Sequence, residues 1–167
     1  MGITVPHTFD DDWDFQSGYY EQIKRIIEWN ATQFIRVYVA DPDADYKRAT
    51  DFTVRIDGGD IAVRIRRASQ KYRDWTIRSY KGGHKTEIHK LKEGFGRFYL
   101  YCWEDEQGRL SEWVLIDLDR VRKAGLLDKT RREIANQDGR TRFIAVPVGE
   151  LDEANCLVVR QLQKKIV

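Results

Sequence analysis

Two arginines and a carboxylate lie in adjacent segments in which polar and apolar residues alternate. Residues 49–56 carry Asp51 near their start, and residues 60–67 carry Arg64 and Arg66. Residues two positions apart in an extended strand share a face, so the two arginines are expected to project together. Guanidinium groups donate charge-assisted hydrogen bonds to phosphate oxygens. The pattern therefore predicts a cationic sheet face suited to binding a phosphodiester.

The same alternation predicts how these arginines are positioned. Asp57-Gly58-Gly59 separates the two segments and is typical of a tight turn, so 49–56 and 60–67 are expected to pair as a β-hairpin. The apolar residues that alternate with the arginines are expected to face a core: Ile61, Val63 and Ile65. One face of the hairpin would then be buried and the other charged.

Charge is distributed unevenly along the chain. The 167 residues carry a formal charge of +2, but residues 1–63 carry −6 and residues 64–97 carry +8. Residues 98–167 carry equal numbers of acidic and basic side chains. A cationic segment attracts polyanions whatever the global charge. The cations that we expect to contact nucleic acid are Arg66, Arg67, Lys71, Arg78, Lys81 and Lys85. The alternative is a solvated surface that serves solubility alone.

The composition also bounds the compartment and the domain count. No stretch approaches the ~20 apolar residues that span a bilayer, and no secretory signal opens the sequence. Cys102 and Cys156 are too few and too far apart for a zinc site or a disulfide framework. We therefore expect no membrane partner and a cytoplasmic location. An acidic lead-in over 1–18 is expected to precede a single domain over 19–167.

The order of the expected elements indicates the fold class. Apolar residues at intervals of three and four predict a helix over 19–34, and Asp117 or Asp119 could cap another that runs to Leu127. Gly94 is expected to cap the end of a short helix over 85–93. Strands are expected at 75–80, 98–103, 113–116, 143–148 and 157–159, with Trp29, Trp103 and Trp113 in the core. This order predicts an α/β (α+β) protein with a mixed sheet flanked by helices.

A helix, a three-strand meander, a helix and a further strand resemble the core of the restriction-endonuclease-like fold, over roughly residues 19–103. The members of this superfamily are the PD-(D/E)XK nucleases, which include phage and mobile-element resolvases. Asp51 occupies the place of the family's metal-binding aspartate, and Arg64 that of its lysine. Glu21 or Glu28 lies on the leading helix, where some resolvase-like members keep an additional acid.

The sequence departs from the family pattern at two positions. Ala62 stands where the family has its second acid, and Arg64 is an arginine, which stabilises phosphate charge but does not act as a base. In some members the following helix supplies the missing acid, and Glu87 is the only acid at the start of that helix. The resemblance thus implies Asp51 and Glu87 as ligands of Mg²⁺, which would lower the pKa of a bound water.

Each carboxylate also has a simpler interpretation. Asp51 could pair with Arg48 or Arg66 as an ordinary residue at the start of a strand. Acids such as Glu87 are favoured in the first turn of any helix by the helix dipole.

Three hypotheses follow for the function. The resemblance implies a nucleic-acid-binding protein that acts as a Mg²⁺-dependent DNA endonuclease in recombination, repair or DNA processing, in a family where homodimers are common. Ala62 supports a catalytically inactive DNA-binding module on the same fold. The acidic segment 1–63 supports a phage-encoded inhibitor that mimics DNA and binds a basic partner.

Overall fold

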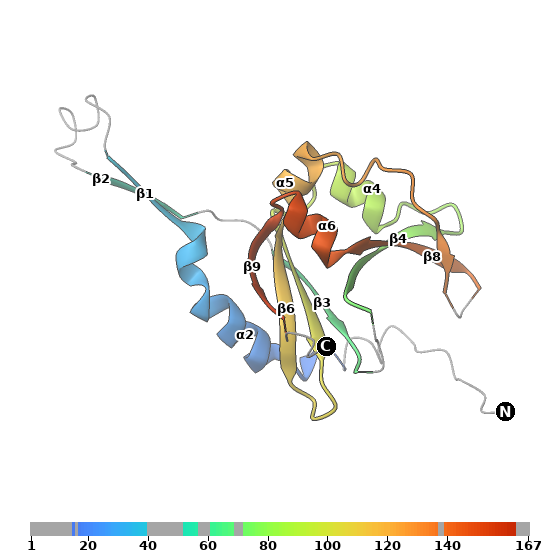
Figure 1. Cartoon of the computed structure of the whole chain (residues 1–167), viewed down its shortest axis with the longest axis horizontal. Coiled ribbons are helices and arrows are strands. Elements are labelled where there is room, and N and C mark those ends of the chain that lie inside the picture. The colour runs from blue at the N-terminus through green and yellow to red at the C-terminus, as the bar shows by residue number, and fades with distance from the viewer. Residues whose placement is uncertain are drawn as a thin grey trace.

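The computed structural model of the chain describes residues 15, 17–39, 52–56, 61–68, 72–136 and 139–162 (Figure 1). The helices in these ranges are α2 (Tyr20–Trp29), η1 (Ala31–Phe34, a 3₁₀ helix), α4 (Glu87–Lys92), α5 (Leu118–Lys123) and α6 (Val148–Glu153). The strands are β1 (Ile35–Val39), β2 (Phe52–Ile56), β3 (Ile61–Arg66), β4 (Asp74–Lys81), β5 (Phe98–Glu104), β6 (Leu110–Asp117), β7 (Ile134–Ala135), β8 (Thr141–Pro147) and β9 (Leu157–Gln161). The predicted mixed α/β class is confirmed.

The described strands form three sheets. The largest has the order β3-β5-β6-β9, the second has the order β4-β8-β7, and β1 pairs with β2 alone. In the four-stranded sheet β3 and β5 run parallel, whereas the other neighbours run antiparallel. The parallel pair requires a long crossover, and α4 lies within it. Helix α2 covers one face of this mixed sheet, while α4, α5, α6 and the second sheet lie on the other side (Figure 1).

The predicted hairpin between 49–56 and 60–67 is wrong. β2 pairs with β1, whereas β3 pairs with β5 at the edge of a different sheet. β4 pairs with β8, so the three strands expected as a meander belong to three sheets. Alternation assigns side chains to faces but does not specify which strand lies alongside. The turn expected at Asp57-Gly58-Gly59 lies outside the described residues.

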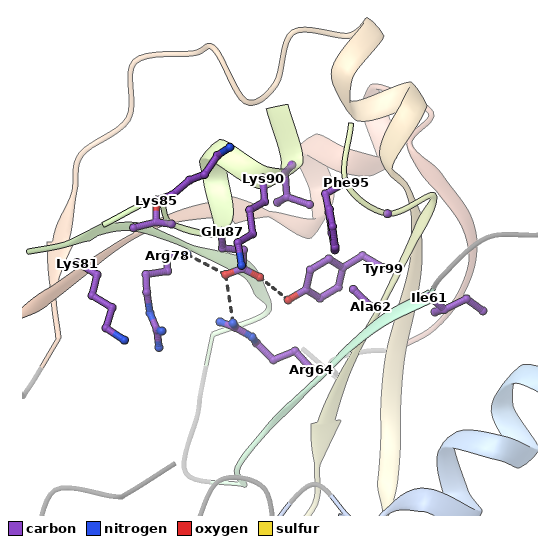
Figure 2. Close-up of a pocket in the computed structure, with 13 residues that line it drawn as sticks. Ile61, Ala62, Arg64, Arg78, Lys81, Lys85, Glu87, Lys90, Phe95 and Tyr99 are labelled. Atoms are coloured by element: carbon purple, nitrogen blue, oxygen red, sulfur yellow. Dashed lines mark hydrogen bonds and ion pairs between the residues drawn. The ribbon is translucent and has the colours of Figure 1, made fainter. Parts of the chain in front are cut away.

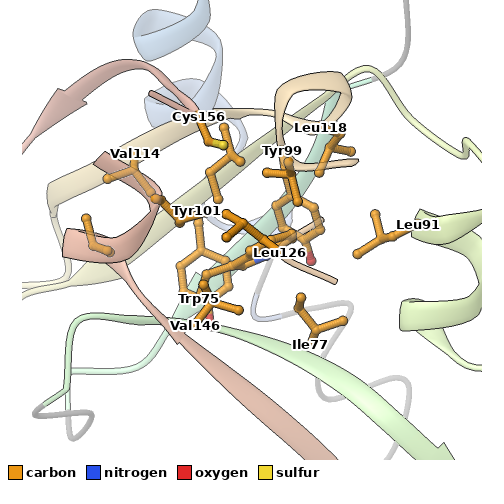
Figure 3. Close-up of a cluster of buried hydrophobic side chains, with 14 of the residues drawn as sticks. Trp75, Ile77, Leu91, Tyr99, Tyr101, Val114, Leu118, Leu126, Val146 and Cys156 are labelled. Atoms are coloured by element: carbon orange, nitrogen blue, oxygen red, sulfur yellow. The ribbon is translucent and has the colours of Figure 1, made fainter. Parts of the chain in front are cut away.

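β5 lies inside the four-stranded sheet because it is apolar on both faces. Tyr99 and Tyr101 project into a core that also contains Trp75 of β4, Leu91 of α4 and Leu118 of α5 (Figure 3). The alternate residues of β5 form a second core beneath α2: Phe98, Leu100 and Cys102. Burial raises the pKa of the Cys102 thiol to about 12, so this free cysteine remains protonated.

β3 divides its side chains between the two faces, as predicted. Val63 and Ile65 pack in the core beneath α2. Arg64 is in register with Tyr101 on the parallel neighbour, so its side chain projects to the side of α4. The alternation of this segment was therefore sufficient to assign its faces, although it did not reveal its partner strand.

α2 is shorter than the predicted helix over 19–34. It ends at Trp29, and η1 follows it. Ile23 and Ile27 pack against the sheet, whereas Trp29 falls off this apolar face and is 90% exposed. The assignment of Trp29 to the core is therefore wrong, while Trp103 and Trp113 are buried as expected. No helix in the described ranges combines the length and the apolar character needed to cross a bilayer.

The predicted acidic lead-in lies mostly outside the described residues, which include Phe15 and residues 17–18 of it. The Phe15 ring packs edge-on against Tyr19, with centroids 5.3 Å apart, and the Arg67 guanidinium lies 3.9 Å from its centroid. The end of this segment thus contributes to the core beneath α2.

Candidate functional site

A hollow of about 450 Å³ lies beside β3, β4 and α4, and we call it the cationic pocket (Figure 2). Its lining includes five cationic side chains and one carboxylate. The cations are Arg64, Arg78, Lys81, Lys85 and Lys90, and the acid is Glu87. Apolar and aromatic groups complete the wall, Phe95 and Tyr99 among them. The excess of positive charge favours an anion over a cation in this pocket.

Glu87 connects the elements around the pocket. Its Oε2 accepts a hydrogen bond from the backbone N–H of Arg78 at 3.0 Å, and its Oε1 accepts one from the Tyr99 hydroxyl at 2.6 Å. Arg64 Nη2 lies 3.1 Å from Oε2 in an ion pair (Figure 2). These partners come from β4, β5 and β3, so one carboxylate joins α4 to the four-stranded and the three-stranded sheets.

Burial and charge determine the protonation states in this network. Burial raises the pKa of Tyr99 well above its usual value, and Glu87 raises it further while Arg64 opposes the change. The phenol therefore keeps its proton and donates a hydrogen bond to Glu87. Burial by itself would lower the pKa of Arg64, but Tyr99 and Glu87 raise it above its usual value. Arg64 therefore remains a cation.

The start of α4 is held against β4. The Thr86 backbone N–H donates to Nδ1 of His89 at 3.3 Å, which satisfies one of the amide donors at the helix start. The Thr86 hydroxyl lies 3.2 Å from the carbonyl oxygen of Ser79 and 2.8 Å from Nδ1 of His89. Glu87 follows Thr86 directly, so these bonds place its carboxylate.

Two of the pocket cations already have carboxylate partners. Arg64 pairs with Glu87, and Lys85 pairs with Glu93. For Arg78, Lys81 and Lys90, no carboxylate in the described part of the chain lies within 4.0 Å. Lys81 and Lys90 are also exposed. These three cations can therefore meet an anion without first giving up an internal ion pair.

The structure brings most of the predicted cluster together. Arg64, Glu87, Arg78, Lys81 and Lys85 all line the cationic pocket. Sequence analysis did not single out three further lining residues: Lys90, Phe95 and Tyr99. The spacing of three residues between Glu87 and Lys90 on one helix could have revealed the first of these.

Other predicted site residues lie elsewhere. Glu21 is exposed on α2, which covers the opposite face of the four-stranded sheet, and it does not line the pocket. Arg66 and Arg67 are also absent from the lining, and Arg67 lies over Phe15. Asp51 and Lys71 fall outside the described residues. β2, which begins directly after Asp51, is in a different sheet from Arg64.

Glu87 does not present an open carboxylate to a metal ion. An ionised carboxylate offers about four acceptor positions, and three partners already contact the oxygens of Glu87. The guanidinium of Arg64, 3.1 Å from Oε2, also repels a cation there. Within the described ranges, no group of three or more His, Cys, Asp or Glu side chains could hold a metal. These contacts indicate that Glu87 anchors α4 and do not fit a Mg²⁺ ligand.

No protein-family model, no curated protein and no solved structure matches the chain.

Proposed function

We propose that this chain is a nucleic-acid-binding protein that holds phosphate groups at the cationic pocket. The observation that carries the proposal is the set of Arg78, Lys81 and Lys90, three cations around one hollow without carboxylate partners among the described residues. Arg64 neutralises the single acid of the lining, so Glu87 offers little repulsion to a phosphate.

The chemistry of these side chains suits a phosphate chain. A lysine ammonium binds phosphate as a flexible point charge, and an arginine guanidinium donates two parallel hydrogen bonds. Cations that neutralise phosphates release condensed counterions, which makes binding strongly dependent on salt. The +8 charge of residues 64–97 supplies the field that attracts the polyanion to this region.

A salt titration tests the proposal. Fluorescence anisotropy would measure the affinity for a labelled DNA fragment at several salt concentrations, for the natural chain and for a Lys81→Ala/Lys90→Ala double variant. We expect weaker binding and a log K against log salt slope that is shallower by about 1.8 on a duplex or about 1.4 on a single strand, because each lost phosphate contact removes about 0.9 or about 0.7 respectively.

The matched control is Lys24→Ala, which removes a lysine from α2 on the other side of the sheet. It should leave both the affinity and the slope unchanged. An equal loss in the control and the double variant would contradict a specific site. If the natural chain binds no nucleic acid but captures a basic protein, the inhibitor hypothesis replaces the proposal.

Mg²⁺-dependent DNA cleavage on a restriction-endonuclease-like core is the second candidate. It is supported by the parallel pairing of β3 and β5 around a crossover that contains α4. If the chain cuts DNA, Asp51→Ala should abolish Mg²⁺-dependent nicking while binding is retained. Nicking that persists in this variant would remove Asp51 from the reaction, and a natural chain that binds without nicking would reject the candidate.

A further inference from the structure

We infer that the cationic pocket receives one unpaired nucleotide of a single strand, with its base against Phe95 and its phosphate on Arg78 and Lys81. This inference rests on the proposed function and specifies its substrate class. It is carried by Phe95, a large apolar side chain that is 69% exposed at the edge of a pocket of about 450 Å³.

The backbone holds Phe95 away from the core. Gly94 and Gly96 flank it with φ of +93° and +76°, which favour glycine. The N–H of Phe95 donates to the carbonyl of Lys90 at 3.0 Å, and that of Gly94 donates to Leu91 at 3.3 Å. These two bonds form a Schellman motif at the end of α4. The motif often adds an apolar contact to the helix, but the residue at that helix position here is the cationic Lys90.

Arg122 of α5 restrains the loop that carries Phe95. Its guanidinium donates to the carbonyl of Leu91 at 3.1 Å and to that of Gly96 at 3.2 Å, on either side of Phe95. A Cβ on Gly96 would lie 3.2 Å from Leu118 Cδ1, so the loop packs closely on α5. Phe95 is thus exposed on a restrained loop, and little loop ordering would oppose the binding of a ring against it.

The pocket separates its charged and aromatic walls. Arg78 and Lys81 lie on one side, Phe95 and Tyr99 lie on the other, and Glu87 lies between them (Figure 2). A nucleotide has the same division, with an anionic phosphate at one end and a flat base at the other. Alternating phosphate and base contacts of this kind are typical of proteins that bind single strands.

The size and shape of the pocket favour an unpaired nucleotide over a duplex. A hollow of about 450 Å³ is within the range of sites for single small molecules. In a duplex the faces of the bases are stacked on each other, and only their edges reach the grooves. A base can meet the Phe95 ring only when it is unstacked.

The experiment compares Phe95→Ala with the natural chain on a short single-stranded DNA, on the duplex of the same sequence and on an abasic single strand. We expect the variant to bind the single strand about 5- to 150-fold more weakly, which corresponds to the ~1–3 kcal/mol of one stacked base. Its affinity for the duplex and for the abasic strand should not change, because neither presents an unstacked base.

Two further variants serve as controls. Phe95→Tyr keeps a ring and should retain single-strand affinity, whereas Trp29→Ala removes a more exposed ring from α2 and should have no effect. Circular dichroism melting would show that each variant is folded.

Each outcome has a defined consequence. Unchanged single-strand affinity in Phe95→Ala, or an equal loss on all three probes, overturns the inference. A natural chain that binds duplex in a salt-dependent way without preferring single strands keeps the proposed function and overturns this inference alone. A chain that binds none of the three probes overturns both.

Discussion

Two hollows of similar volume lie on opposite faces of the four-stranded sheet. The cationic pocket measures about 450 Å³, and a second hollow of about 480 Å³ lies between α2 and β9. Arg25, Trp29, Trp113 and Arg160 are among the residues that line the second one, which we call the tryptophan hollow. Volume alone therefore does not distinguish a binding site in this molecule.

The two hollows differ in how their charges are paired. Of the two arginines that line the tryptophan hollow, Arg160 donates to Asp152 of α6 at 2.5 Å, so Arg25 is the one lining cation without a carboxylate partner in the described part of the chain. The buried Trp113 belongs to the core beneath α2. In the cationic pocket the acid is occupied by Arg64, while Arg78 and Lys81 have no carboxylate partner in the described part of the chain. The difference indicates that the tryptophan hollow belongs mainly to packing, whereas the cationic pocket gathers more cations that are available to an anion.

The largest expected effect is on stability, in the tryptophan hollow. Trp113→Ala should lower the free energy of unfolding by about 3–5 kcal/mol, since it removes a buried ring and leaves a cavity. Urea denaturation would measure this loss, and DNA affinity of the folded protein should not change. A marked loss of DNA affinity in folded protein would place both hollows in one binding surface.

The next effect is on binding, in the cationic pocket. Arg78→Ala should weaken DNA binding by roughly 10- to 150-fold, which corresponds to the ~1.5–3 kcal/mol of hydrogen bonds to a charged group. The Arg78 backbone N–H still reaches Glu87 in this variant, so its stability should remain close to that of the natural chain. The matched control is Arg160→Ala, and equal losses of affinity in the two variants would remove the contrast between the hollows.

Glu150 lies outside both hollows, so its titration should affect the stability of the fold without affecting DNA binding at the cationic pocket. Hydrogen bonds from Arg131 and then Lys129 lower the pKa of Glu150 from 4.5 to about 2. Because the folded pKa is depressed, this stabilisation is present above pH 4.5 and is lost as the pH falls towards 2. Glu150→Gln should lower the free energy of unfolding by about 1 kcal/mol at neutral pH. Its free energy of unfolding should also fall less steeply than that of the natural chain as the pH is lowered.

Denaturation curves at several pH values would measure this difference. DNA binding between pH 5 and 8 should be the same in Glu150→Gln and the natural chain, because Glu150 does not line the cationic pocket. If the free energy of unfolding falls equally steeply at acidic pH in both proteins, Glu150 contributes nothing to the pH dependence of stability.

The smallest expected effect is at Trp29. With 90% of its surface exposed, Trp29→Ala should change the free energy of unfolding by no more than about 0.5 kcal/mol. Melting temperature and DNA affinity would both be measured. A large loss of affinity would show that an exposed aromatic on the α2 side also contacts the ligand, which would weaken the contrast between the two hollows.

Sequence analysis predicted well those features that depend on neighbours along the chain. The alternation in β3 assigned Arg64 and Ile65 to opposite faces, and the buried run of β5 was recognised as a strand. Asp117 caps α5 by accepting from the backbone N–H of Arg120 at 3.0 Å, as one of the two expected caps. Gly94 ends α4 with a positive φ. Each of these features depends on a few consecutive residues, so it can be recognised from the sequence alone.

The partners of each strand and the role of each acid could not be predicted in this way. Glu87 was expected to bind a metal, and nothing in its neighbourhood in the chain indicated its contacts with Arg64, Tyr99 and the Arg78 backbone from three strands. Phe95 was not expected at the site, because nothing near it in the chain indicates that its loop meets β3.

The sequence by itself determined how β3 divides its residues between two faces, where most strands and helices lie along the chain, and where positive charge accumulates. Only the tertiary structure decided that β3 pairs with β5, and that α4 and the loop after it bring Glu87, Lys90 and Phe95 to the pocket that Arg64 lines. The physical reason is that local periods and caps arise from bonds between near neighbours. The pocket arises where β3, β4, α4 and β5 pack together, and that packing depends on the strand pairing of the whole domain.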